Sequence, residues 1–226
     1  PLNSHHNFFV IHDGLDLGQW RKRMGAWTRP DARRELGLGP DDLGLLLVGT
    51  VCERKGQQDL ARACALLDRR SSERLHCFIV GDRPSPYSRA LAKLVQRLDP
   101  GLRARFHVLP ETRDVALYYR AADLFVCTSR IESYPRVTLE AMAAGLPIVS
   151  TPVFGLSEQL VEGVNAVFYR PGDVKALSTA LRTMVAEPKR RLAMAERSPQ
   201  VFAGLKSFDQ MAREYLELFQ EAVESK

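Results

Sequence analysis

Residues 43–51 read Leu-Gly-Leu-Leu-Leu-Val-Gly-Thr-Val and decide the fold class. A continuous apolar run of this length is typical of a strand that is buried on both faces, as in a parallel sheet. The next apolar residues recur at the i, i+3, i+4 and i+7 spacing of an amphipathic helix: Leu60, Ala63, Cys64 and Leu67. A buried strand followed by such a helix is the first unit of an α/β fold.

The same alternation continues to about residue 186. Further strands are predicted at residues 75–81, 106–109, 124–128, 148–150 and 166–169. Helical patterns separate them, at about residues 91–98, 114–122, 137–144, 157–161 and 173–186. Strands that alternate with helices at this spacing predict an α/β protein with a doubly wound parallel sheet.

Composition is that of a folded globular protein. Of 226 residues, 45% are hydrophobic and 26% are charged. No segment reaches the roughly 18 apolar residues that a membrane helix needs, so we expect a cytoplasmic protein. The four cysteines contain no Cys-x-x-Cys pair and are predicted to be buried, reduced thiols. No Asp-x-Asp pair or metal-ligand spacing occurs, and we assign no metal site.

The net charge of +5 raises the question of an anionic partner. The basic excess lies within residues 43–186, where it is dispersed along helix-like stretches without interleaved aromatic residues. A single-strand binding surface needs such aromatic residues, so we expect no nucleic-acid partner. A basic middle segment suits an anionic ligand or an anionic membrane surface.

Ligands of doubly wound sheets bind beyond the carboxyl ends of the strands. There the chain has no Gly-x-Gly-x-x-Gly and no Walker loop, and Gly155-Leu156-Ser157 lacks the closing glycine of a hydrolase elbow. These absences disfavour dinucleotide-binding proteins, P-loop ATPases and serine hydrolases.

After the predicted strand at 124–128 comes Glu-Ser-Tyr-Pro-Arg-Val-Thr-Leu-Glu, residues 132–140. Two carboxylates thus flank a predicted helix start, with Pro135 in its first turn and Ser133 as a candidate cap. Free N–H groups at such a start bind phosphate, and carboxylates accept hydrogen bonds from sugar hydroxyls. The ordinary alternative is that Glu140 pairs with Arg136 on the helix and that Glu132 is solvated.

The whole stretch resembles the Glu-x7-Glu signature of the retaining GT-B glycosyltransferases (group 1, family 4), which transfer sugars from nucleotide donors. The resemblance covers nearly the entire chain: Val-Ile-His-Asp-Gly-Leu-Asp at 10–16 looks like the linker into the donor domain, and residues 49–56 look like its first strand and loop. The residues at 155, 158 and 163–165 match the downstream pattern, although Ala166 replaces the common second glycine.

This resemblance implies the Rossmann-like C-terminal half of a GT-B fold. Residues 1–42 would be an interdomain linker and lead-in, residues 43–186 the nucleotide-sugar donor-binding domain, and residues 187–226 C-terminal helices.

The resemblance also implies two catalytic residues. Lys55 matches the lysine that contacts the donor diphosphate, where its charge would stabilise the leaving nucleotide in place of a metal ion. Glu132 would hold hydroxyls of the donor sugar. Thr50 stands where the family commonly has an arginine. Arg54 is our candidate for that second cation, with an ordinary surface arginine as the equal alternative.

The remaining implied residues would bind the rest of the donor. Backbone N–H groups for the diphosphate would come from residues 134–137, and Glu140 would hold the ribose hydroxyls. The base would lie near residues 109–112, mostly against backbone, so UDP, GDP and ADP all remain open. The implied donor-binding set is Arg54, Leu109, Pro110, Tyr134, Pro135, Arg136, Val137 and Glu140. No cofactor and no metal are expected.

The C-terminal segment has the pattern of an amphipathic helix with an apolar face that needs a packing partner. Ser207 and Gln210 form a capping-box pattern before a wide apolar stripe. The stripe consists of Phe208, Met211, Tyr215, Leu218, Phe219 and Ala222. In the family this helix crosses back to the N-terminal acceptor-binding domain. Contact with that domain, a homodimer through the helix, and ordinary core packing all remain open.

The function implied is the donor-binding half of a retaining glycosyltransferase of polysaccharide biosynthesis, with a glycan or lipid-linked acceptor and peripheral contact at the inner membrane face. This chain alone is expected to transfer slowly or not at all. The alternative from another class is a noncatalytic nucleotide-binding or interaction module of GT-B ancestry, to which Thr50 points. A GT-B epimerase or phosphorylase is disfavoured by the Glu-x7-Glu spacing.

Overall fold

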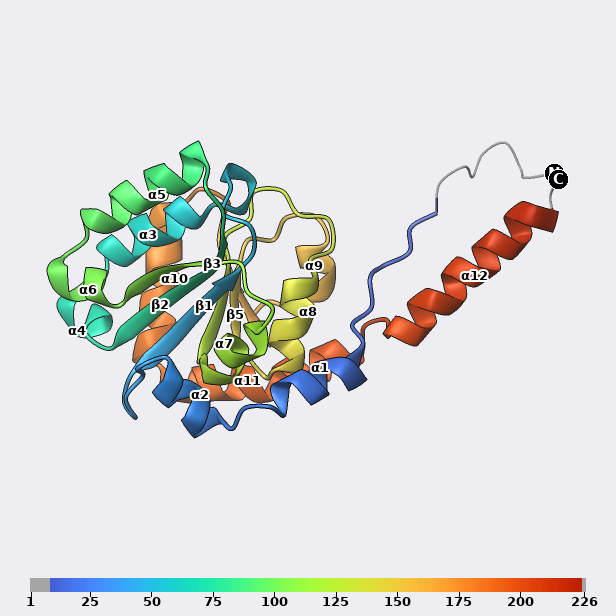
Figure 1. Cartoon of the computed structure of the whole chain (residues 1–226), viewed down its shortest axis with the longest axis horizontal. Helices are drawn as coiled ribbons and strands as arrows, with labels where there is room; N and C mark the ends of the chain where they lie inside the picture. Colours follow the sequence, from blue (N-terminus) through green and yellow to red (C-terminus); the bar gives the residue numbers. More distant parts are fainter. Residues whose placement is uncertain (1–8, 225–226) are drawn as a thin grey trace.

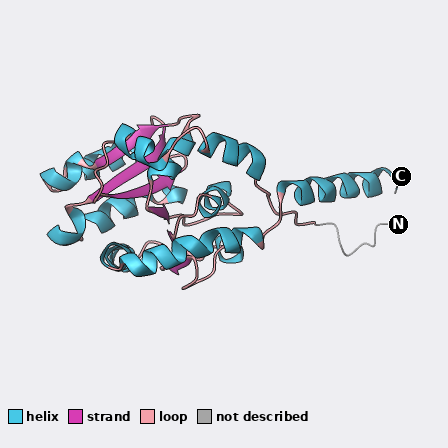
Figure 2. Ribbon diagram, turned by 90° about the horizontal axis from the view of Figure 1, so that it is seen from below, coloured by secondary structure: helices cyan, strands magenta, loops and turns pink. Residues whose placement is uncertain are grey.

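Six parallel strands form the centre of the structure, a computed structural model that describes residues 9–224 (Figures 1 and 2). The strands are β1 (Leu43–Val48), β2 (Leu75–Asp82), β3 (Phe106–Pro110), β4 (Leu124–Cys127), β5 (Ile148–Ser150) and β6 (Ala166–Phe168). Their order in the sheet is β3-β2-β1-β4-β5-β6, with every pair parallel. This order confirms the doubly wound sheet and places its switch point between β1 and β4.

Helices cover both faces of the sheet (Figure 1). They are α1 (Leu17–Met24), α2 (Arg29–Glu35), α3 (Gln57–Ala65), α4 (Arg69–Ser72), α5 (Pro86–Gln96), α6 (Pro100–Ala104), α7 (Val115–Ala121), α8 (Arg136–Ala143), α9 (Leu156–Gln159), α10 (Val174–Ala186), α11 (Pro188–Ala203) and α12 (Phe208–Glu224), with a 3₁₀ turn η1 at Glu53–Lys55. The expected strands and helices of residues 43–186 are all present, with ends shifted by a few residues.

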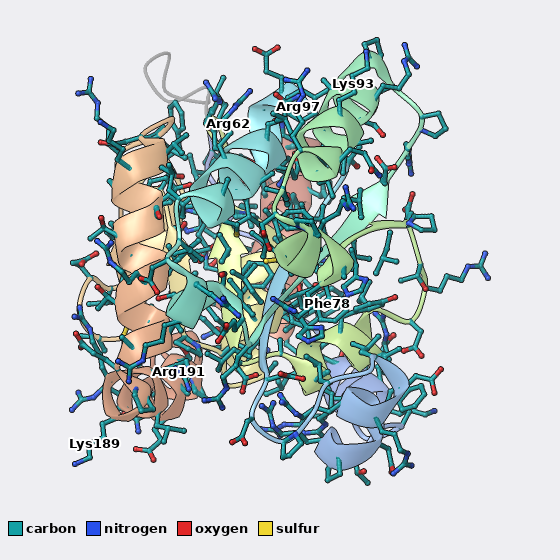
Figure 3. All side chains as sticks on the ribbon, turned by 90° about the vertical axis from the view of Figure 1, so that its left-hand side faces the viewer. Arg62, Phe78, Lys93, Arg97, Lys189 and Arg191 are labelled. Atoms are coloured by element: carbon teal, nitrogen blue, oxygen red, sulfur yellow. The ribbon has the colours of Figure 1, made fainter. Side chains whose placement is uncertain are left out.

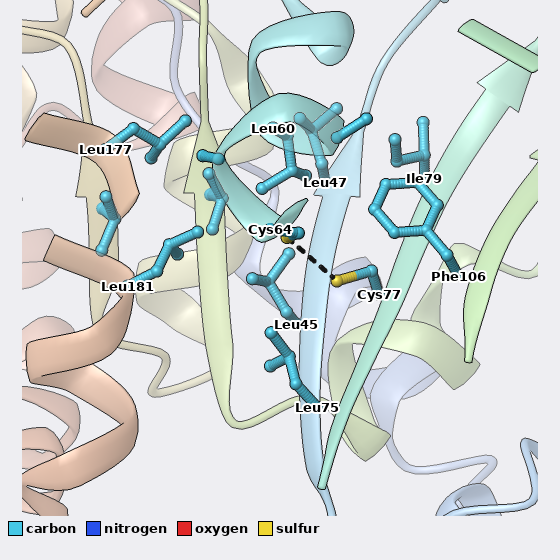
Figure 4. Close-up of a cluster of buried hydrophobic side chains, with 14 of the residues drawn as sticks. Leu45, Leu47, Leu60, Cys64, Leu75, Cys77, Ile79, Phe106, Leu177 and Leu181 are labelled. Carbon is cyan, nitrogen blue, oxygen red and sulfur yellow. Dashed lines mark hydrogen bonds between the residues drawn. The ribbon is translucent and has the colours of Figure 1, made fainter. Parts of the chain in front are cut away.

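Side chains of β1 alternate between two cores. Leu45 and Leu47 join the core under α3, α5 and α10, whereas Leu46 joins the core under α1, α2, α7 and α8. Figure 4 shows the first core, where the Sγ atoms of Cys64 and Cys77 lie 3.7 Å apart as free thiols. Burial on both faces explains why this strand is continuously apolar.

Residues 17–35, within the segment expected to be a linker and lead-in, form α1 and α2. Arg29 and Arg33 of α2 hold the Asp123 carboxylate at 2.6 and 2.9 Å. The same carboxylate accepts the Gly44 N–H at 2.8 Å, at the start of β1. Trp20 of α1 is buried edge-on against Tyr119 of α7. The lead-in therefore packs as part of the domain. Its residues 1–8, like residues 225–226, lie outside the described residues.

Helix α12 stands apart from the sheet (Figures 1 and 2). Its predicted capping box forms: Gln210 N–H donates to Ser207 Oγ at 3.2 Å, and Ser207 N–H donates to Gln210 Oε1 at 2.8 Å. None of the α12 side chains over residues 208–224 is buried, so core packing of the apolar stripe is wrong. Within residues 9–224, no helix is long and apolar enough to cross a membrane.

Two histidines lie side by side on β2 and β3. The rings of His76 and His107 are stacked with centroids 6.1 Å apart, and His107 also stacks on Phe78 at 4.8 Å. His76 Nδ1 and His107 Nε2 are buried without a hydrogen-bond partner among the described residues. Protonation of either ring would therefore place a positive charge in a partly desolvated site.

Burial lowers the pKa of both histidines. Around His76, the Asp42 carboxylate 3.4 Å away opposes this shift, whereas the charges of His107, Arg105 and Arg33 add to it. Because the folded-state pKa lies below the unfolded value of about 6.5, the unfolded chain binds more protons between the two values. The contribution of the two neutral histidines to the free energy of unfolding is fully present above their unfolded-state pKa. It is lost as the pH falls through their lower folded-state pKa.

We predict that the free energy of unfolding falls as the pH is lowered from 7.5 to 5. The His107→Phe variant should show a shallower fall, because one titrating ring is gone while its stacking on Phe78 remains. Urea unfolding at several pH values measures both. An unchanged pH slope in His107→Phe would contradict the assignment to this ring.

Candidate functional site

The candidate site lies at the carboxyl ends of β1 and β4, on the switch point of the sheet. Lys55, in the turn after β1, and Glu132, in the loop after β4, form a direct ion pair there. Both side chains are largely buried, Glu132 with 6% exposed. Sequence-distant loops thus meet where ligands of such sheets bind.

Backbone contacts hold these two loops together. Thr128 Oγ1 donates to the Lys55 carbonyl oxygen at 2.6 Å, and Arg130 N–H donates to the Arg54 carbonyl oxygen at 2.8 Å. Gly56 makes this approach possible, because a Cβ atom there would lie 2.3 Å from the Thr128 carbonyl oxygen, and its φ of +67° favours glycine. The position of the Lys55 side chain is therefore set by backbone packing.

Three side chains bind the Glu132 carboxylate. Besides Lys55, Ser129 Oγ donates to Oε2 at 3.2 Å, and Arg54 Nη1 donates to Oε1 at 3.3 Å. The ordinary alternative of a solvated Glu132 is therefore wrong, because the loop folds this side chain inward against two cations. Arg54 turns toward the site while keeping about half its side chain exposed, and Thr50 is exposed. A carboxylate has about four acceptor positions, so Glu132 retains capacity for one more donor.

Helix α8 begins directly after this loop, and Pro135 is its N-cap residue. The expected Ser133 cap is wrong: Ser133 lies two residues before the N-cap and is exposed, and no side chain of the described residues caps α8. Pro135 has no N–H to donate, which removes it as a diphosphate donor. The N–H groups of Arg136 and Val137 have no partner within α8 and are open to an anion.

Helix α9 packs against the start of α8 and holds it by hydrogen bonds. The buried Gln159 donates through Nε2 to the Pro135 carbonyl oxygen at 3.2 Å and also contacts the Thr138 hydroxyl. Gly155 at the start of α9 touches Ser133, since a Cβ atom there would fall 1.7 Å from the Ser133 carbonyl oxygen. The Gly155 position therefore requires glycine for packing.

Glu140, one turn into α8, is oriented by a residue that sequence reasoning missed. The hydroxyl of the buried Tyr119 lies 3.0 Å from Glu140 Oε2 and 3.1 Å from the Val137 carbonyl oxygen, which share its proton. The expected ion pair with Arg136 does not form among the described residues. Burial raises the pKa of Glu140, against the lowering effects of the Tyr119 hydrogen bond and of Arg136 and Arg23. A partly desolvated carboxylate of this kind gains from hydroxyl donors.

The lead-in also contributes to the site. His12 stacks on Tyr134 with ring centroids 4.4 Å apart, and His12 Nε2 lies 2.9 Å from Glu158 Oε2 of α9. This places the Tyr134 ring against the lead-in and gives Glu158 a partner. A lone histidine far away in sequence carries no signal for such a contact.

Leu109 and Pro110, expected near the base of the donor, are the last two residues of β3 at the carboxyl edge of the sheet. Leu109 is half-buried and Pro110 is exposed. Next to them, Glu111 pairs with Arg83 of the loop after β2, with Arg83 Nε 2.9 Å from Glu111 Oε2. In residues 9–224, no three His, Cys, Asp or Glu side chains come together as metal ligands.

The chain is similar to known proteins of one family. A family model described as "Glycosyl transferases group 1" matches residues 28–201. D-inositol 3-phosphate glycosyltransferase 1 of Catenulispora acidiphila is 32% identical over 222 residues, which are 95% of this chain and 52% of that protein. The chain spans about half the length of the curated relatives it matches.

Solved structures show the same fold. HepE from Anabaena, in complex with UDP and glucose, has a TM-score of 0.80 at 23% identity, over 94% of this chain and 56% of that one. The C-terminal domain of the group 1 family protein LpcC from Francisella tularensis has a TM-score of 0.67 at 16% identity, over 85% of this chain and 94% of that one. The expected Rossmann-like, C-terminal half of a GT-B fold is thus confirmed.

The match to the family model covers most of the chain, and the structure has the fold of the solved glycosyltransferase structures. The chain belongs to the group 1 glycosyl transferases.

Proposed function

We propose that this chain is the donor-binding half of a retaining glycosyltransferase, which transfers a sugar from a nucleoside-diphosphate sugar to a glycan or lipid-linked acceptor. The observation that carries the proposal is the Lys55–Glu132 pair across the β1/β4 boundary, directly before the open N–H groups of α8. Membership of the family supports it, as does the UDP and glucose bound by HepE, whose fold this chain shares.

The diphosphate would lie between Lys55 and the start of α8. Lys55 and Arg54 supply two positive charges on one side, and the N–H groups of Arg136 and Val137 with the helix dipole supply the other. As the bond to the sugar breaks, negative charge grows on the leaving diphosphate, and these fixed groups would stabilise it without a metal ion.

Glu132 and Glu140 would position the donor. Glu132, already bound by Lys55, Arg54 and Ser129, has little freedom to act as a nucleophile, and its remaining acceptor position suits a sugar hydroxyl. A front-face route, in which the leaving phosphate helps to deprotonate the acceptor, requires no such nucleophile and would retain the configuration. Glu140 would accept the ribose hydroxyls beside Tyr119.

A second domain would bind the acceptor. The apolar face of α12, of which no side chain over residues 208–224 is buried, fits a contact with that domain, and a homodimer through this face is the alternative. Thr50 favours the second candidate function, a noncatalytic nucleotide-binding or interaction module, because its exposed side chain brings no charge to the diphosphate position.

We predict that one of UDP, GDP and ADP binds the chain in calorimetric titrations, equally with and without excess EDTA. Glu140→Ala should weaken this binding at least about tenfold, since two hydrogen bonds to a charged group are lost. Glu196→Ala, on the exposed face of α11, is the matched control and should bind normally. Binding by none of the three nucleotides would favour the interaction module.

Tyr119→Phe should weaken binding of the same nucleotide by roughly fivefold, because the Glu140 carboxylate loses the donor that orients it. In a Glu140→Ala background the change should have no further effect. Tyr118→Phe is the control, since its hydroxyl has no hydrogen-bond partner in the described residues. Additive losses in the double variant would show that Tyr119 acts through general stability and not through Glu140.

The Glu132→Gln variant should distinguish binding of the sugar from binding of the nucleotide. It frees Lys55 for the phosphates, so affinity for the nucleoside diphosphate should hold or rise, whereas the extra affinity for the matching sugar nucleotide should fall. The ratio of the two dissociation constants measures this, with Glu196→Gln as control. An unchanged ratio would contradict a contact between Glu132 and the sugar.

A further inference from the structure

A large hollow lies at the opposite end of the sheet from the candidate donor site. Its volume is about 820 Å³, and its walls come from the amino end of β1, from α4 and its flanking turns, and from the junction of α10 and α11. Leu43 of β1 is part of the wall, about 16 Å along the strand from Val48 at the donor-site end. A ligand here would not overlap the nucleotide.

Four arginines line this hollow, which we call the arginine cavity: Arg70, Arg74, Arg182 and Arg191. Arg70 and Arg182 have no hydrogen bond or ion pair in the part of the chain that the structure describes. Arg191 Nη1 donates to the Met184 carbonyl oxygen at 2.6 Å, which fixes the guanidinium at the end of α10 and leaves its other nitrogens open. Figure 3 faces this side of the molecule and shows Arg191 beside that end of α10.

The two acidic residues of the lining offset only part of the charge of the four arginines. Asp68 accepts the Ser71 N–H at 2.9 Å and the Ser71 hydroxyl at 3.1 Å as the cap of α4, and it acts on Arg182 only through space. Glu73 pairs with Arg69, which is not part of the lining, at 2.6 Å. Neither carboxylate forms an ion pair with an arginine of the lining, and four arginines against two carboxylates leave the lining with an excess of positive charge.

The positive groups also stand close to one another. Burial lowers the pKa of Arg191; the charge of Asp123 opposes this shift, and the charge of Arg74 adds to it. Arg74 has one partner, the exposed Asp41 at 3.2 Å. The remaining wall is apolar and includes Leu43 and Val185, which strengthens the field of the arginines. Helix α10 ends and helix α11 begins at this wall, so the opposite ends of their dipoles offset each other there and the arginine side chains supply the positive charge.

From these contacts we propose that the arginine cavity binds a multiply charged phosphate ester, at a site separate from the nucleotide site. Guanidinium groups match phosphate oxygens in paired hydrogen bonds, which a single surface cation does not offer. The volume falls within the range of small-molecule sites. A soluble phosphorylated compound and the headgroup of an acidic lipid present the same chemistry.

The first experiment titrates the whole chain with inorganic pyrophosphate in a calorimeter at physiological salt. The variant Arg70→Gln/Arg182→Gln should bind at least about tenfold more weakly, and it should fold normally because both side chains are exposed and neither has a hydrogen bond or ion pair among residues 9–224. Arg89→Gln/Arg97→Gln, exposed on and just after α5, is the matched control. Lys55→Gln, at the donor site, should keep this binding. No binding, or an equal loss in the α5 variant, overturns the proposal.

A second experiment distinguishes the two sources of phosphate. Vesicles of phosphatidylcholine with phosphatidylglycerol are sedimented with the chain, with and without pyrophosphate. Cosedimentation that pyrophosphate and Arg70→Gln/Arg182→Gln both abolish identifies a lipid headgroup. Pyrophosphate binding without cosedimentation identifies a soluble ligand. Equal affinity of the variant and the unmodified chain for both probes would contradict the site.

Discussion

The pairing of β1 with β4 is the constraint on which the site depends. β1 pairs with β2 over six residues but with β4 only through Leu45–Leu124 and Leu46–Phe125, after which β4 continues beside β5. Among the described residues, β1 and β4 form no further backbone pairs. The chain continues from β1 into α3 on one face of the sheet and from β4 into α8 on the other face. Beyond the paired residues, the side chains of Lys55 and Glu132 join the loops that follow the two strands. A ligand site arises there because the strand order reverses.

The buried Lys55–Glu132 ion pair is not expected to contribute much to the free energy of folding. Removing Lys55 and Glu132 from water has a cost that their attraction offsets only with good geometry and further hydrogen bonds. Ser129 and Arg54 supply those bonds, and Gly56 brings the two loops close enough to permit them. The arrangement keeps a cation and an acceptor ready at fixed positions, so that little reorganisation accompanies the arrival of a charged ligand.

The sequence predicts the strands well because burial on both faces leaves a continuous apolar run, as in Leu45 to Leu47, that needs no knowledge of the partner strand. The spacing of Glu132 and Glu140 likewise marks the two ends of one loop and helix. What could not be predicted depends on contacts between distant residues. Tyr119 is an ordinary core tyrosine until α7 is placed beside α8, and His12 has no signal before the lead-in is seen against Tyr134. Ser133 failed as a cap because helix starts depend on one or two residues of backbone geometry.

The cationic side chains at the two ends of the sheet differ in their partners. At the carboxyl end, Lys55 and Arg54 are bound to Glu132, so an anion there must share cations that already have a partner. At the amino end, Asp68 and Glu73 are bound to Ser71 and Arg69, and of the cavity's arginines Arg70 and Arg182 have no hydrogen bond or ion pair among the described residues. On the two proposals, an anion at the first end would be selected by geometry and by its hydroxyl groups, whereas at the second end it would be selected mainly by charge. Basic residues at the two ends of the sheet would then serve two kinds of recognition, of which only the first depends on the switch point.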